Sequence, residues 1–184
     1  MFIVTVTNGF ACSDLDSVIV VVNHLPESNA GPDTAFCSGG SASIGTNNTP
    51  GYHYSWNTAN GLSDSTLANP TVTWTNNDTI TDTLTFIVTT TVDSCSTSDS
   101  VTVIVFPLPI VDAGEDKYLC SESTDTIGST PIGTYTYSWN TANGLSDSTL
   151  ANPTVALSND SIVNDTNMFI VTVTNGFACS DLDS

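Results

Sequence analysis

In this chain of 184 residues, cysteine is the residue type whose number and spacing indicate a chemical role. The five cysteines recur in two sets at a nearly constant offset: Cys12, Cys95 and Cys179 in one set, Cys37 and Cys120 in the other. Zinc sites usually hold two of their thiolates two to four residues apart, and no pair here has that spacing. The spacing therefore argues against zinc, and the partners of these thiols depend on the elements that carry them.

Neither histidine is a convincing catalytic base. His24 lies beside a proline between two apolar segments, and His53 lies among alternating aromatic residues. In a near-copy of the sequence around His53, the same place is taken by Thr136. A catalytic base would not be expected to vanish from a near-copy, and no other catalytic constellation is visible. The chain is therefore predicted not to be an enzyme.

Four aspartates near predicted turns are weak candidates for calcium binding: Asp33, Asp64, Asp116 and Asp147. Calcium takes six to eight oxygen ligands, and the chain has no D-x-D-x-D-G loop that would supply them. A lone carboxylate in a turn more often hydrogen-bonds its own backbone. The sequence therefore predicts no cofactor, and calcium stays open as the alternative.

The elements that carry these residues are repeated. Met1–Ser17 recurs letter for letter as Met168–Ser184, and Tyr54–Val72 recurs unbroken as Tyr137–Val155. The repeating module is thus about 83 residues long, which is enough for one small core, and two alternating versions make a period of twice that length. We expect Met1 to be an internal residue and the chain to be a window cut from a longer tandem array. Such arrays usually act through length, stiffness and repeated surface.

Composition excludes several classes of protein. One basic residue stands against nineteen acidic ones, for a formal charge of −18, so the chain will not bind nucleic acid or anionic lipid through charge. Disorder does not fit a hydrophobic content of 39 % with patterned apolar residues. No apolar run reaches the 18 residues of a membrane span. Abundant Thr, Val and Ser with few helix formers predict an all-β chain.

Proline-flanked junctions divide the chain. The apolar runs Val18–Val22 and Val101–Phe106 each end at a linker with proline, which cannot extend a sheet. We therefore expect residues 1–25 to be the final hairpin of a preceding module and residues 26–108 to be a complete β-sandwich. Residues 109–184 would be a second sandwich, truncated before its last strand. The short linkers predict closely seated neighbours.

An aromatic stripe marks the third strand of each module. Tyr52, Tyr54 and Trp56 alternate with polar residues and so share one face of a strand. About seven strands with a tryptophan on the third are typical of an immunoglobulin-like sandwich. The predicted core aromatics are Tyr54, Trp56, Tyr137 and Trp139. A platform that stacks sugars is the less favoured interpretation of the same stripe.

The order of these motifs resembles a known family. The sequence runs A-G-P-D, Cys37, Y-S-W, A-N-P-T, F-I-V-T, Cys95 and V-T-V, and is similar to the PKD-like and immunoglobulin-like tandem repeats of giant Bacteroidota cell-surface proteins. The resemblance covers essentially the whole chain. It implies export by the type IX system, display on or beyond the outer membrane, and roles in adhesion, gliding or prey capture. The cysteines and near-identical repetition differ from PKD domains attached to hydrolases.

Export makes disulfides the expected state of the cysteines. In such a sandwich the last hairpin turn and the end of the first strand lie at opposite poles. A strand of about seven residues spans roughly 23 Å, whereas the Cα atoms of a disulfide lie within about 7 Å. A bond from each module to its successor, Cys37 to Cys179, is therefore favoured. The bond within one module, Cys37 to Cys95, stays open.

The family resemblance also suggests O-glycosylation. Asp followed by Ser or Thr and then an apolar residue or Thr is similar to the Bacteroidota O-glycan acceptor, although Asp-Ser is also ordinary at the start of a strand. The candidate acceptors are Ser17, Thr34, Ser65, Thr79, Thr83, Ser100, Thr126, Ser148 and Ser161.

The sequence predicts a structural segment of a giant extracellular filament or adhesin stalk with a mechanical role. The expected partners are neighbouring modules of the same chain and further copies in a homo-oligomeric fibre, with a target-cell or glycan surface as a further candidate. Nucleic acid and membrane insertion are not expected. Two alternatives remain, a glycan- or cell-binding module and a spacer in a secreted hydrolase.

Overall fold

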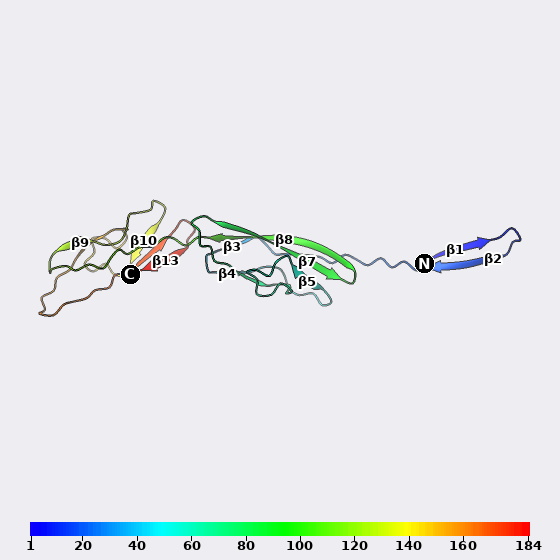
Figure 1. Ribbon diagram of the computed structural model, residues 1–184, viewed down its shortest axis with the longest axis horizontal. Helices are drawn as coiled ribbons and strands as arrows, with labels where there is room; N and C mark the ends of the chain where they lie inside the picture. The colour runs from blue at the N-terminus through cyan, green and yellow to red at the C-terminus, as the bar shows by residue number, and fades with distance from the viewer.

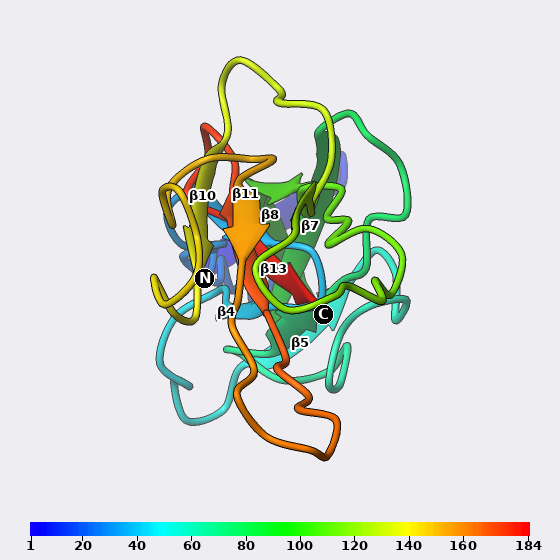
Figure 2. The ribbon, with the colours of Figure 1, turned by 90° about the vertical axis from the view of Figure 1, so that its left-hand side faces the viewer.

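The computed structural model describes residues 1–184 as 13 strands without a helix. The strands form a hairpin and two sandwich-like bodies that follow one another along an elongated molecule (Figure 1). Viewed along the long axis, the bodies lie one behind the other (Figure 2). The structure contains no helix long and apolar enough to cross a membrane.

The N-terminal hairpin stands apart from the rest of the molecule. Strands β1 (Phe2–Thr7) and β2 (Ser13–Val18) pair antiparallel, and every one of their residues is exposed. An extended segment without strands connects β2 to the first sandwich (Figure 1). The hairpin therefore presents both of its faces to solvent.

The first sandwich contains a four-stranded sheet and a two-stranded sheet. The larger has the order β3-β8-β7-β5, in which β3 runs parallel to β8 and the other pairs are antiparallel. The smaller pairs β4 with β6. Apolar residues alternate along β7 and β8, so one face of that hairpin is buried. The bounds are β3 Thr34–Cys37, β4 Ser41–Ser43, β5 His53–Trp56, β6 Thr71–Thr73, β7 Asp82–Val92 and β8 Cys95–Phe106.

The core of the first sandwich is aliphatic around one tryptophan. Trp56 is buried, and its Nε1–H donates to the carbonyl oxygen of Leu67 at 2.9 Å. The nine buried residues are Ala30, Ile44, Trp56, Val72, Phe86, Val88, Val101, Val103 and Val105. Three of them come from β8, which makes this last strand a major contributor to the core.

The second sandwich repeats this plan with fewer strands. One sheet has the order β10-β12-β13 and the other pairs β9 with β11. Its core has six buried residues: Ala113, Ile127, Trp139, Val155, Val171 and Val173. The bounds are β9 Thr124–Thr126, β10 Thr136–Trp139, β11 Thr154–Ala156, β12 Val171–Thr174 and β13 Ser180–Asp183.

A glycine at the same place in both sandwiches shows how closely the modules match. Gly45 and Gly128 have φ angles of 78° and 81°, which glycine adopts without strain. A Cβ atom at Gly45 would collide with the carbonyl oxygen of Ala68, and one at Gly128 with that of Ala151. The expected all-β fold of tandem immunoglobulin-like modules is confirmed.

Candidate functional site: the disulfide-bonded junction

The two sandwiches are joined by a disulfide bond. Cys37 is the last residue of β3 and Cys179 comes just before β13, and their Sγ atoms are bonded across 142 residues of sequence. The Cα atoms lie 5.6 Å apart, within the normal range for a disulfide. Cys179 is fully buried and Cys37 half-buried. The bond therefore connects the end of the first sandwich to the last hairpin of the second.

An aromatic pair packs beside this bond. Phe106 ends β8, and Phe177 lies in the turn between β12 and β13. Their ring centroids are 4.4 Å apart with an interplanar angle of 9°, which is a stacked geometry. Stacked rings contribute about 0.5–1.5 kcal/mol beyond the area that they bury. The pair therefore holds the turn of the second sandwich against the last strand of the first.

Asn175 shapes the turn and attaches it to the linker. Its Oδ1 accepts from the N–H groups of Phe177 at 3.0 Å and Cys179 at 3.1 Å. Its Nδ2–H donates to the carbonyl oxygen of Pro107 at 2.9 Å. The side chain is buried, and a buried amide needs such partners. One residue thus presents Cys179 to Cys37 and ties the turn to the linker.

The linker between the sandwiches is short and constrained. Pro107 and Pro109 are both buried, while Leu108 between them is partly exposed. Proline fixes φ near −65° and so reduces the freedom of the segment. Together with the disulfide, the stacked rings and the Asn175 hydrogen bond, the prolines make this junction a stiff connection.

The other cysteines are not paired within this chain. Cys12 and Cys120 are exposed, Cys95 is half-buried, and all three have free thiols. Cys12 has the same place in the N-terminal hairpin that Cys179 has in the second sandwich. Cys95 lies at the opposite end of the first sandwich from Cys37, at the start of β8.

The structure gives three of the four candidate calcium aspartates other partners and does not bring the four together. Asp64 accepts from the N–H of Thr66 at 2.8 Å and from its hydroxyl at 2.7 Å, and these bonds lower the pKa of Asp64. Asp147 and Thr149 repeat this arrangement. Asp33 accepts the N–H of Thr102 at 2.8 Å.

Asp116 is exposed and has no hydrogen-bond partner. The structure contains no cluster of three or more His, Cys, Asp or Glu side chains that could hold a metal ion. Asp64 and Asp147 therefore hydrogen-bond within their own turns, whereas Asp33 connects to the distant strand β8.

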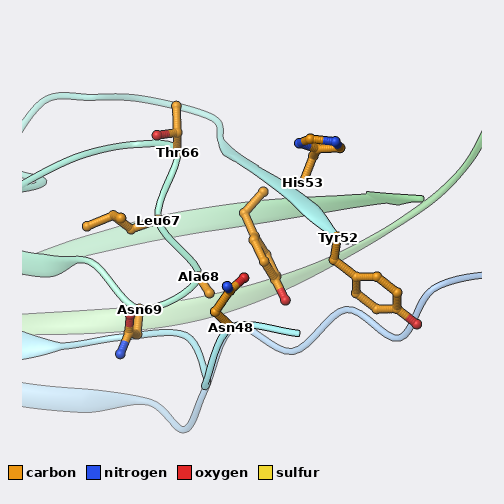
Figure 3. Close-up of a pocket in the computed structure, with 8 residues that line it drawn as sticks. Asn48, Tyr52, His53, Thr66, Leu67, Ala68 and Asn69 are labelled. Atoms are coloured by element: carbon orange, nitrogen blue, oxygen red, sulfur yellow. The ribbon is translucent and has the colours of Figure 1, made fainter. Parts of the chain in front are cut away.

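The aromatic stripe divides between the core and a surface pocket. Trp56 and Trp139 are buried, and Tyr54 and Tyr137 pack against the two cores. A pocket of about 470 Å³ lies over β5 and includes Tyr52, His53 and Leu67 in its lining. Figure 3 shows the rings of Tyr52 and His53 on opposite sides of the strand, with the Tyr52 ring far from Leu67. This pocket has no stack of parallel rings.

The candidate glycan acceptors lie on the surface. Six are exposed: Ser17, Thr79, Thr83, Ser100, Thr126 and Ser161. Three are half-buried: Thr34, Ser65 and Ser148. Ser65 and Ser148 also use their carbonyl oxygens to accept the backbone N–H of Trp56 and Trp139, each at 2.9 Å.

Sequence reasoning missed three residues of the junction: Phe106, Asn175 and Phe177. The signal was present, because the turn N-G-F-A-C occurs twice, in residues 8–12 and 175–179. An asparagine four residues before a cysteine indicates a turn that the side chain closes. What the turn contacts could not be read from the segment itself.

The comparisons with solved structures return matches of low sequence identity and low TM-score. No protein-family model matches the sequence, and the search of curated proteins finds no relative. The human desmocollin-1 ectodomain matches at 9 % identity and a TM-score of 0.34, over 96 % of this chain and 39 % of that one. The titin Ig tandem domains A164-A165 match at 11 % identity and a TM-score of 0.33, over 84 % of this chain and 91 % of that one.

A bacterial surface protein is also among the matching solved structures. A SusE-like surface located polysaccharide binding protein from the Bacteroides thetaiotaomicron heparin utilisation locus matches at 13 % identity and a TM-score of 0.43, over 85 % of this chain and 33 % of that one. The chain thus spans between a third and two fifths of the length of the desmocollin-1 ectodomain and of this protein.

Proposed function

We propose that this chain is a structural segment of an extracellular filament or adhesin stalk, and that it holds successive modules at a constant separation under tension. The observation that carries the proposal is the Cys37–Cys179 bond, which joins one sandwich to the next rather than closing a single sandwich. A disulfide within one module would stabilise that module alone. A bond between modules resists their separation, which is a mechanical property of the array.

The surroundings of the disulfide support this role. Residues of the turn 175–179 make the disulfide, the ring stack with Phe106 and the hydrogen bond to Pro107. Bending at the linker would have to break all three together. The repeat therefore produces a stiff rod rather than a chain of freely jointed domains.

The location and surface chemistry fit the same role. Disulfides persist in oxidising surroundings outside the cell. The charge of −18 keeps a long chain soluble and makes copies repel one another at low salt. The resemblance to Bacteroidota repeats would make this a surface appendage exported by the type IX system, used in attachment, gliding or prey capture, with several copies in one fibre. No catalytic role is proposed.

Immunogold electron microscopy of the source cells tests this function, using antibodies raised against the 184-residue chain. We expect gold along filaments that project beyond the cell surface. Mass per unit length, measured on the same filaments, would then separate a fibre of several chains from a single-chain stalk. Label confined to the cell interior, or released with a soluble hydrolase, would contradict the proposal.

Glycan binding is a second candidate, favoured by the pocket over β5 with Tyr52 and His53 in its lining. The second sandwich has Thr136 in place of His53 and therefore offers an internal comparison. Binding of glycans to the chain, measured on an array and lost in Tyr52→Ala, would support this candidate. An array without signal would remove it and leave the mechanical role as it stands.

A further inference from the structure

The outer face of the four-stranded sheet in the first sandwich carries no Asp, Glu, Lys or Arg side chain. Its two longest strands, β7 and β8, run along the long axis of the molecule (Figure 1), and alternate residues of each point outward. The register places outward residues side by side, as the pairs Thr85 with Thr102, Ile87 with Ser100, and Thr89 with Ser98. We call the outward surface of β3, β5, β7 and β8 the neutral face.

The acidic residues of β7 and β8 lie in the other phase of the alternation. The Oδ2 of Asp82 on β7 accepts the Nε1–H of Trp74 at 3.2 Å. The Oδ2 of Asp99 on β8 accepts the backbone N–H of Ala30 at 2.8 Å. Both carboxylates are therefore held away from the neutral face.

Further carboxylates lie at the rim of the neutral face. Asp33 comes just before β3, and its Oδ1 accepts the N–H of Thr102 at 2.8 Å at that edge of the sheet. Asp93 lies in the turn between β7 and β8. Protein interfaces commonly combine a centre poor in charge with a polar rim. The neutral face has this arrangement.

The charge of the chain makes a face without carboxylates significant. Nineteen acidic residues against one basic residue give a formal charge of −18. Two copies therefore repel one another wherever their acidic surfaces meet. At the neutral face, two copies can approach without bringing carboxylates together. The occupant for which this absence of charge matters most is a second copy of the same chain.

The neutral face continues into an interface that is already formed. Phe106 is the last outward residue of β8, and its ring stacks on Phe177 of the second sandwich with centroids 4.4 Å apart. Ile104, the outward residue before it, is half-buried, and Ile87, near the middle of the face, is 40 % exposed. A sandwich of the same kind thus already covers one end of this face, which favours another such sandwich on the remainder.

The area of the neutral face fits a weak contact. The strands β7 and β8 have 11 and 12 residues and are therefore about 36–41 Å long. With the shorter β3 and β5 the face covers about 500 Å², so two copies would bury about 1,000 Å² in total. A stable interface usually buries about 1,600 Å². One pair of sandwiches should therefore associate weakly.

Repetition along the chain strengthens such a contact. The second sandwich has Ser138 paired with Thr172 where the first has Ser55 paired with Thr89. All of these residues except the half-buried Thr89 are exposed. Two chains lying side by side would make several such contacts, and linked weak contacts give a much higher total affinity than one alone.

We propose that the neutral face of one copy packs on the neutral face of a second copy and forms the lateral contact between two chains. The same surface takes part on both sides, so the contact has two-fold symmetry. The facing sheets lie about 10 Å apart, with Ile87 near the centre and Ser and Thr hydroxyls bonding across the contact. A two-fold axis directed along the molecule keeps the two chains parallel, as a fibre requires.

This inference rests on the proposed function, in which several copies form one fibre, but its test uses only the purified chain. The free thiols are alkylated so that no disulfide forms between copies, and association is measured by analytical ultracentrifugation over a range of protein and salt concentrations. We expect dimers whose association strengthens with salt. The Debye length falls from about 30 Å at 0.01 M salt to about 3 Å at 1 M, which screens the repulsion between acidic chains.

Two matched variants make the test specific. Ile87→Asp places a charge near the centre of the neutral face, and Ile80→Asp places the same charge in the loop before β7, where Ile80 is 71 % exposed. Both side chains are exposed, so neither change removes a core residue. We expect Ile87→Asp to weaken the association roughly tenfold or more, because each copy would bury an unpaired charge. Ile80→Asp should associate as the parent does.

A mixing experiment tests the symmetry of the contact. Ile87→Asp and Ile87→Lys bring opposite charges together only if the neutral face of one copy meets that of another. An equimolar mixture should therefore associate more strongly than Ile87→Asp alone.

Three results would overturn the inference. The parent could remain monomeric at every salt concentration, Ile87→Asp could associate as readily as Ile80→Asp, or the mixture could associate no better than Ile87→Asp alone. A monomeric parent that binds a neutral glycan, with binding lost in Ile87→Asp, would assign the face to that glycan instead of a second copy. None of these results changes the immunogold labelling of source cells, which tests the proposed function separately.

Discussion

When a single molecule is stretched from its two termini, the disulfide should prevent a large part of the chain from extending. In the oxidised chain, force passes from Cys37 to Cys179 through the sulfur atoms, so the 142 residues of sequence between them cannot extend. A chain extends by at most about 3.3–3.6 Å per residue. Reduction should therefore release up to about 470–510 Å, whereas the segments outside the bond supply only roughly 140 Å.

The same bond should contribute to thermodynamic stability. In the chain-entropy account, closing a loop of this length stabilises the folded state by about 5 kcal/mol. Native strain and residual structure usually bring measured values nearer to about 2–4 kcal/mol. Chemical denaturation of the oxidised and reduced chains should show a difference of this size.

The assay is force spectroscopy of the chain between handles at residues 1 and 184, with and without reductant. Cys37→Ser should show the full length in both conditions, and Cys95→Ser, which keeps the bond, should behave as the parent does. Equal contour lengths for the oxidised parent and Cys37→Ser would refute the idea that the disulfide carries force between the sandwiches.

Three further predictions concern the junction and its surroundings. Asn175→Ala should lower the free energy of unfolding of the second sandwich by about 1–3 kcal/mol, because buried groups of the turn and the linker lose their hydrogen-bond partners. Chemical denaturation measures this change, and the control variant Asn8→Ala, in the N-terminal hairpin, should have little effect. A double-mutant cycle of Phe106→Ala and Phe177→Ala should give a coupling energy of about 0.5–1.5 kcal/mol, and a value near zero would mean that the ring stack does not stabilise the junction. The N–H groups of Ala113 and Ser184 lower the pKa of Asp183 below its ordinary value of 3.8. The carboxylate of Asp183 therefore stabilises the fold above its pKa in the unfolded chain, and this stabilisation is lost as the pH falls through its lower pKa in the folded chain. Below about pH 4 the second sandwich should therefore melt at lower temperature, and Asp183→Asn should flatten that dependence in calorimetry.

The sequence predicted the fold class because its evidence is local. Alternation at Tyr52, Tyr54 and Trp56 indicates a strand with one apolar face, and the constant offset between the copies indicates one module repeated. Such signals depend on neighbouring residues in the chain, which the sequence contains. The all-β tandem sandwich follows from them.

The junction depended on tertiary structure. The sequence left Cys37 with two candidate partners, and the structure bonds it to Cys179 because those two poles are the ones that come within bonding distance. The contacts of Phe106 with Phe177, and of Asn175 with Pro107, likewise join segments far apart in the sequence. No local pattern encodes which surfaces meet.

The duplicated segment shows most directly what the sequence determines and what it does not. The sequence determined the hairpin itself, since residues 1–17 and 168–184 have the same register and the same turn. It could not determine burial, because Val4 is exposed and its twin Val171 is not. Register and turn are set by bonds within the segment, whereas burial depends on whether strand β10 lies beside it, and only the tertiary structure supplies that neighbour.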